Sequence, residues 1–313
     1  MQKKKNIQLL IILSVLVVIT ILLYSISDEK RGTNLAKEIF AVADTAQITR
    51  VEIMHEGKGT VLSRKSGRWM VNDKYLLDEG MRTVLLSVLN RVRAQRQVAE
   101  VMQAEVIDSL RENGYQVKIY GQSQLLMEYV AGGDKEANVS YFKKPEEETP
   151  YVVHLPGYES YVAGLFEITE NDWRNRIVLA TNWNIIDTLA LDYPRNPESS
   201  FSIIFRNNKY LVPEVAEADT SVLYNFMDKV SYIVADQYIN PGQYPQYDSV
   251  ANTKPLAILS VKEIGEKEAE KISIFPPLPQ ERMLLGKFDN QMILFDFNRI
   301  RSILIRREAL ADE

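Results

Sequence analysis

The sequence contains no cysteine and only two histidines among its 313 residues. Without cysteine there is no disulfide, no thiol nucleophile and no thiolate metal site. Two histidines are too few for a multi-histidine metal centre. Phosphate-binding loops and the Gly-x-Ser-x-Gly motif of serine hydrolases are also missing from the sequence. We therefore expect no catalytic residue, no cofactor and no metal.

The charge balance narrows the choice of partners. The net charge is −5 at pH 7, with 25% charged and 46% hydrophobic residues. Such a composition is typical of a folded globular chain, whereas a protein dedicated to nucleic acid is usually basic. We expect no nucleic-acid partner.

One long apolar run lies at the N-terminus, from Ile7 to Ile26, and Lys3, Lys4 and Lys5 precede it. A helix of about 20 residues spans the hydrocarbon core of a membrane. The apolar stretch of a cleaved signal peptide, the alternative, would be shorter, about 7–15 residues. The residues assigned to the anchor are Leu9, Leu10, Ile11, Ile12, Leu13, Val15, Leu16, Val17, Val18, Ile19, Ile21, Leu22 and Leu23.

The lysines before the run predict the orientation, since positive charge stays on the cytoplasmic side. The expectation is a single-pass protein of the bacterial inner membrane, with a cytoplasmic N-terminus and a periplasmic bulk. Residues 1–27 would form the cytoplasmic tip and the transmembrane anchor.

The remaining chain contains one order of elements twice. Alternating strands begin at Ile48 and again at Ile186, 138 residues later (186 − 48). A helical apolar stripe follows each meander, from Met81 to Val92 and from Val222 to Val230. We predict an α+β fold in which two tandem related units follow the anchor, each an antiparallel sheet with a packed helix. The predicted bounds are a linker and entry at 28–47, a first repeat at 48–170, a connection at 171–185 and a second repeat at 186–313.

A family resemblance rests on four segments and on the N-terminal anchor. The segments are Ile48–Ile53, the pair Val61–Arg64 and Gly67–Asn72, and Leu110–Tyr115, followed by the same pattern a second time. The chain resembles a family of bacterial envelope proteins of unknown function. Members are often encoded beside auxiliary components of gliding-type ABC transport systems. The resemblance implies an envelope location and a transporter partner, and it carries over no catalytic residue.

Candidate partner contacts lie around the join between the repeats, which Trp173 and Trp183 flank, and around a Pro/Tyr segment near Tyr238. Asn171–Arg176 is the densest mixture of aromatic and basic residues, which favours either a recognition patch or a segment that docks the halves. A Pro/Tyr segment, Asn240–Tyr247, takes the place of a second helix and favours either a contact surface or a connection folded on its own sheet. The candidate contact residues are Trp173, Arg174, Arg176, Trp183, Tyr238, Tyr244 and Tyr247.

The leading functional hypothesis is a non-catalytic accessory or interaction module of an envelope complex, with an ABC-type transport system as the candidate. Its partners would be the inner membrane and a membrane or envelope protein complex. The first alternative is a periplasmic ligand-binding module with a site between the repeats. The second is a hydrolase-type enzyme, which would need His55 or His154 beside a carboxylate in a cleft. Both histidines end predicted strands, where ordinary surface histidines are commoner.

Overall fold

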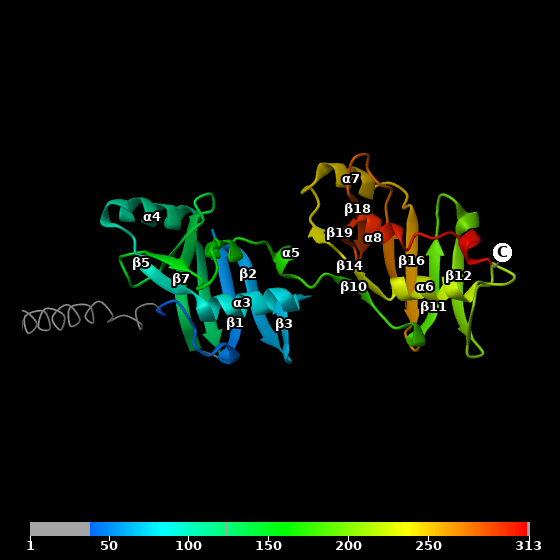
Figure 1. The fold of residues 1–313 in the computed structure, drawn as a ribbon, viewed down its shortest axis with the longest axis horizontal. Coiled ribbons are helices and arrows are strands. Elements are labelled where there is room, and N and C mark those ends of the chain that lie inside the picture. The colour runs from blue at the N-terminus through cyan, green and yellow to red at the C-terminus, as the bar shows by residue number, and fades with distance from the viewer. Residues whose placement is uncertain (1–37, 123, 312–313) are drawn as a thin grey trace, which may run out of the picture. The chain divides into compact units, whose positions relative to one another are not determined.

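The computed structural model describes residues 38–122 and 124–311. The chain divides into two compact units, of which the first ends at Glu170 and the second begins at Asn171 (Figure 1). Each unit is built around one large antiparallel sheet.

The first unit has a nine-stranded sheet in the order β4-β3-β2-β1-β6-β7-β8-β9-β5. Strand β1 alternates as its sequence predicts, with Val51 and Ile53 buried. Its elements are η1 Thr45–Gln47, β1 Ile48–His55, β2 Lys58–Lys65, β3 Arg68–Val71, β4 Tyr75–Leu76, α3 Glu79–Arg91, β5 Arg93–Gln97, α4 Glu100–Asn113, β6 Tyr115–Gly121, β7 Gln124–Asp134, β8 Val139–Lys143, β9 Tyr151–His154 and η2 Val162–Leu165.

The second unit has an eight-stranded sheet in the order β13-β12-β11-β16-β17-β18-β19-β15, and a two-stranded ribbon, β10-β14. Helix α6 buries Leu223, Phe226, Met227 and Val230 in the main core. The elements of the unit are β10 Ile177–Ala180, η3 Trp183–Ile185, β11 Ile186–Asp192, η4 Pro197–Ser199, β12 Phe201–Arg206, β13 Lys209–Leu211, α6 Thr220–Val230, β14 Tyr232–Val234, β15 Gln237–Ile239, α7 Pro245–Ala251, β16 Ala257–Glu263, β17 Glu270–Ile274, β18 Met283–Phe288, β19 Gln291–Asp296, α8 Phe297–Arg301 and η5 Arg307–Leu310, and α5 Glu170–Trp173 lies where the two units join.

The two sheets have the same connectivity. From β3 to β5 and from β13 to β15, the strands follow each other in the same chain order. A 3₁₀ turn, capped by Asp44 in one unit and Asn182 in the other, precedes each central strand. Both central strands shift register one residue after they begin, at Ile48 and at Ile186. Helix α4 has 14 residues where the second unit has α7, with seven.

The predicted α+β class is wrong, because the fold is mostly β. Nineteen strands and six α-helices lie within the described ranges. Among the strands that the sequence pattern missed are β5, which directly follows α3, and β14 and β15, which come one after the other behind α6. These short strands find their partners far along the chain, as Arg93 does opposite His154. The hydrophobic period within a short segment does not predict pairing with a strand far away in the sequence.

The predicted membrane placement is also contradicted. In residues 38–122 and 124–311, no helix is long and apolar enough to cross a membrane. The longest there, α4, has 14 residues and carries charges along its length, against the roughly 20 apolar residues that a span needs. The residues assigned to the anchor, Leu9 to Leu23 within 1–27, lie outside the described residues. The prediction of a single-pass inner-membrane protein with a periplasmic bulk is therefore corrected.

Candidate interaction surface

Three of the candidate contact residues lie in the interior of the second unit. Trp173 is fully buried, and Arg174 and Tyr238 are nearly so. The Arg174 guanidinium lies over the Tyr238 ring, 3.7 Å from its centroid, and Nη1 donates to Asn171 Oδ1 at 3.1 Å. Its Nη2 donates to Gln291 Oε1 on β19. These contacts fasten the start of the unit to its own sheet, so these side chains are not displayed to a partner.

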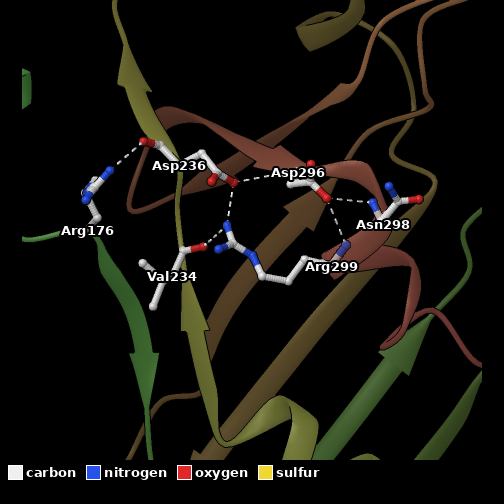
Figure 2. Close-up of polar contacts among 6 residues, drawn as sticks. All are labelled: Arg176, Val234, Asp236, Asp296, Asn298 and Arg299. Carbon is white, nitrogen blue, oxygen red and sulfur yellow. Dashed lines mark hydrogen bonds and ion pairs between the residues drawn. The ribbon is translucent and has the colours of Figure 1, made fainter.

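Arg176 belongs to a polar network that joins the β10-β14 ribbon to the large sheet (Figure 2). At Ala235 and Asp236 the backbone passes from hydrogen bonding with the ribbon to hydrogen bonding with strand β19 of the large sheet. Ala235 N donates to Arg176 O, and Asp236 N donates to Leu294 O, both at 2.8 Å. The Arg176 side chain donates to the backbone carbonyl of Asp236 at 3.2 Å.

The Asp236 carboxylate is the centre of this network. Its Oδ2 accepts from Asp296 N at 2.6 Å and from the Arg299 guanidinium, which also donates to Val234 O at 2.9 Å (Figure 2). The Asp296 side chain in turn caps helix α8 by accepting from Asn298 N and Arg299 N. One aspartate thus fixes the end of the ribbon, the end of β19 and the start of α8.

Tyr244 and Tyr247 lie at the start of α7, where Pro245 occupies the first turn. Tyr247 is buried against Phe275, Leu285 and Leu294, and its hydroxyl donates to Met283 O at 3.3 Å. Burial raises the pKa of Tyr247. The Pro/Tyr segment is therefore folded against its own sheet, which was the alternative interpretation of its sequence.

Among the aromatic candidates, Trp183 is the one that lies on the surface, with 43% of its area exposed. Its ring meets that of Tyr224 edge to face at 5.8 Å, and Tyr224, which is 44% exposed, meets Tyr210 at 6.3 Å. Tyr210 contacts Phe205 at 5.1 Å. We call Phe205, Tyr210, Trp183 and Tyr224 the aromatic surface.

Tyr210 holds the aromatic surface together. Its hydroxyl donates to the carbonyl oxygens of Trp183 and Ile186, the latter at 3.1 Å. Burial raises its pKa. The sequence singled out Trp183 but neither Tyr210 nor Tyr224, which lie on β13 and α6. A signal was present at Tyr224, an aromatic residue just outside the buried stripe of its helix.

The first unit forms the same topology without this surface. Thr45 begins η1 as Trp183 begins η3. Leu86 follows the buried Leu85 on α3 as Tyr224 follows the buried Leu223 on α6. The hairpin pair Arg64 and Trp69 corresponds to Phe205 and Tyr210. The fold therefore does not require aromatic residues at most of these positions.

The histidines take part in ordinary packing. His55 Nδ1 lies 3.0 Å from Gly114 O, and its ring stacks on Tyr115 at 4.8 Å. His154 ends β9 opposite Arg93. Within the described ranges, neither histidine forms an ion pair with a carboxylate, and no three acidic or histidine side chains gather as metal ligands.

Comparison of the chain with protein-family models, with curated proteins and with solved structures finds no match. The resemblance to the envelope family stays a prediction, and so does a ligand site between the repeats.

Proposed function

We propose that the protein is a non-catalytic interaction module whose aromatic surface binds a protein partner. The observation that carries this proposal is the difference between the two units. They share one sheet order, yet only the second has Trp183 and Tyr224 at positions where the first has Thr45 and Leu86. Exposed aromatic residues that folding does not require favour a role in binding.

The chemistry of these residues supports a protein partner. Tryptophan and tyrosine are enriched among residues that carry most of the energy of protein interfaces. They supply a large contact area at a small cost in side-chain entropy. Because the Tyr210 hydroxyl already binds the backbone next to η3, the aromatic surface loses less conformational entropy when a partner binds.

The family resemblance suggests the complex to examine. An accessory role in an ABC-type transport system would give the module a large protein partner, and the aromatic surface would be its docking face. This part of the proposal depends on the resemblance, whereas the binding role depends on the surface alone.

The test is an affinity purification of the tagged full chain in mild detergent, with quantitative mass spectrometry of the proteins that copurify. We expect the double variant Trp183→Ala, Tyr224→Ala to lose a partner that the wild-type chain retains. Tyr232→Ala is the matched control, since Tyr232 is an exposed tyrosine of the same unit outside the aromatic surface. If all three chains retain the same proteins, or retain none, the proposal fails.

A further inference from the structure

A groove in the first unit lies beside helix α3. Its cavity has a volume of about 310 Å³, which is at the small end of ligand sites. Along α3 it is lined by Thr83, Val84, Ser87, Val88 and Arg91, and across from the helix by Leu155, Tyr158 and Ser160.

The walls of this α3 groove are apolar and open to solvent. Val84 is 46% exposed and Tyr158 is 62% exposed. Val84, Ser87 and Arg91 follow each other along one side of α3, while Leu85 and Leu89 on another side enter the core. A turn closed by Tyr158 N donating to Leu155 O at 3.0 Å holds the opposite wall in place.

Arg91 places a positive charge at the groove. The Arg91 guanidinium lies over the Tyr158 ring, 5.7 Å from its centroid. The neighbouring arginines are occupied, since Arg82 pairs with Glu79 at 2.7 Å and Arg93 with Glu38 at 3.0 Å. Among the residues that the structure describes, neither Arg91 nor the exposed Glu159 joins an ion pair.

We propose that the α3 groove binds a peptide segment of a partner protein in which a large apolar side chain stands beside an aspartate or glutamate. The apolar side chain fills the cavity between Val84 and Leu155. The carboxylate accepts hydrogen bonds from Arg91, whose planar fork suits a carboxylate. The rim hydroxyls of Ser87 and Ser160 can donate to the same acidic group or to the peptide backbone.

The size and charge of the site favour this occupant. A cavity of this volume accepts one or two side chains and is too small for the chains of a lipid. Arg91 provides one charge-assisted contact, whereas a nucleic acid needs several cations along its backbone. The proposal is independent of the aromatic surface, which lies in the other unit.

The first experiment is a selection of random hexapeptides, displayed on phage, on the full chain and on its Val84→Gln variant. Val84 is exposed, so the substitution removes part of the apolar wall without opening the core. We expect peptides with a large apolar residue next to an acidic one to be enriched on the wild-type chain and not on the variant. Enrichment of other sequences, or equal enrichment on both chains, would overturn the proposal.

The second experiment measures fluorescence anisotropy with an enriched peptide and its Glu→Gln or Asp→Asn counterpart. The acidic peptide should bind about tenfold more tightly than its amide counterpart, because an ion pair replaces a neutral hydrogen bond. Arg91→Gln should abolish that difference. Arg96→Gln, which changes another exposed arginine of the same unit, should preserve it.

Two results would contradict the assignment at this stage. One is a difference between the peptides that persists in Arg91→Gln. The other is binding to phosphatidylglycerol vesicles that depends on Arg91 and is not accompanied by binding of acidic peptides, which would indicate a lipid headgroup.

Discussion

The guanidinium of Arg174 lies 3.7 Å from the centroid of the Tyr238 ring, and both side chains are buried. A buried arginine is costly unless its donors are used. Here two of them reach the side-chain oxygens of Asn171 and Gln291. Asn171 also donates to Tyr238 O at 3.3 Å, so the contact joins side chains and backbone.

Arg174→Lys should lower the free energy of unfolding by about 2 kcal/mol, because an ammonium group can neither stack on Tyr238 nor reach both amide oxygens. Urea unfolding followed by circular dichroism measures the change. Arg176→Ala is the control, since Arg176 is exposed and makes a single hydrogen bond to Asp236 O. It should stay within about 0.5 kcal/mol of the wild-type chain. Equal effects of the two substitutions would contradict the assigned role of Arg174.

Asp236→Asn should destabilise the second unit by about 1–2 kcal/mol, because Arg299 loses its carboxylate and one amide oxygen must serve two donors. The expected local signature is faster hydrogen exchange at Asp296 N and at the start of α8, which the Asp236 carboxylate supports. Asp192→Asn removes an exposed carboxylate of the same unit and should leave both measurements unchanged. Hydrogen exchange that is unchanged at Asp296 in Asp236→Asn would refute the network in Figure 2.

The ionisation of Tyr193 lowers the folding stability at alkaline pH. Burial raises the pKa of Tyr193 to about 12, and its hydroxyl donates to Ile305 O at 2.7 Å. Because the folded-state pKa lies above the unfolded value of about 10, this contribution to stability is complete below pH 10 and is lost between pH 10 and 12.

Tyr193→Phe should therefore be less stable than the wild-type chain by about 1 kcal/mol at pH 8. The difference should shrink as the pH rises from 10 to 12, since only the wild-type chain has this phenol to ionise. Urea unfolding at several pH values measures both curves. A difference that stays constant over this range would show that the phenol is not linked to folding.

Tryptophan fluorescence can test the exposure of the aromatic surface without any partner. The chain has three tryptophans, and Trp69 and Trp173 are buried while Trp183 is not. Trp183→Phe should remove most of the emission that acrylamide quenches in the wild-type chain. Trp69→Phe should leave the quenchable part in place. If quenching is unaffected by Trp183→Phe, the ring is covered in solution.

Much of the local structure is predictable from the sequence. The apolar stripe from Met81 to Val92 predicts α3, and the structure confirms this helix, which Asp78 caps with Oδ1 accepting from Met81 N at 3.0 Å. Gly114 ends α4, where a glycine commonly adopts a left-handed conformation, but its backbone is extended, at φ −78°. Glycine is needed there for space, because a Cβ would lie 2.2 Å from Leu110 O.

The rest could not be predicted because it depends on contacts between distant residues. Trp183, Tyr210 and Tyr224 come from three elements, and only the folded sheet brings them together. The burial of Arg174 depends in the same way on Tyr238 and Gln291. The α3 groove needs the turn at Leu155, which follows a strand whose partner lies before α4.

The order of strands in each sheet also determines how long a newly synthesised strand remains without its pairing partner. Strand β5 leaves the ribosome before α4, yet its partner β9 begins only at Tyr151. At about 5–20 residues per second, β5 waits several seconds without a partner. The same delay recurs for β15, which pairs with β19 close to the C-terminus. Arg93 and Arg96 place positive charge on the waiting strand β5, and charge on an unpaired strand discourages aggregation. Strand β15 carries Tyr238 and Ile239 and no charged residue, so we expect the nascent second unit to depend on chaperones more than the first does.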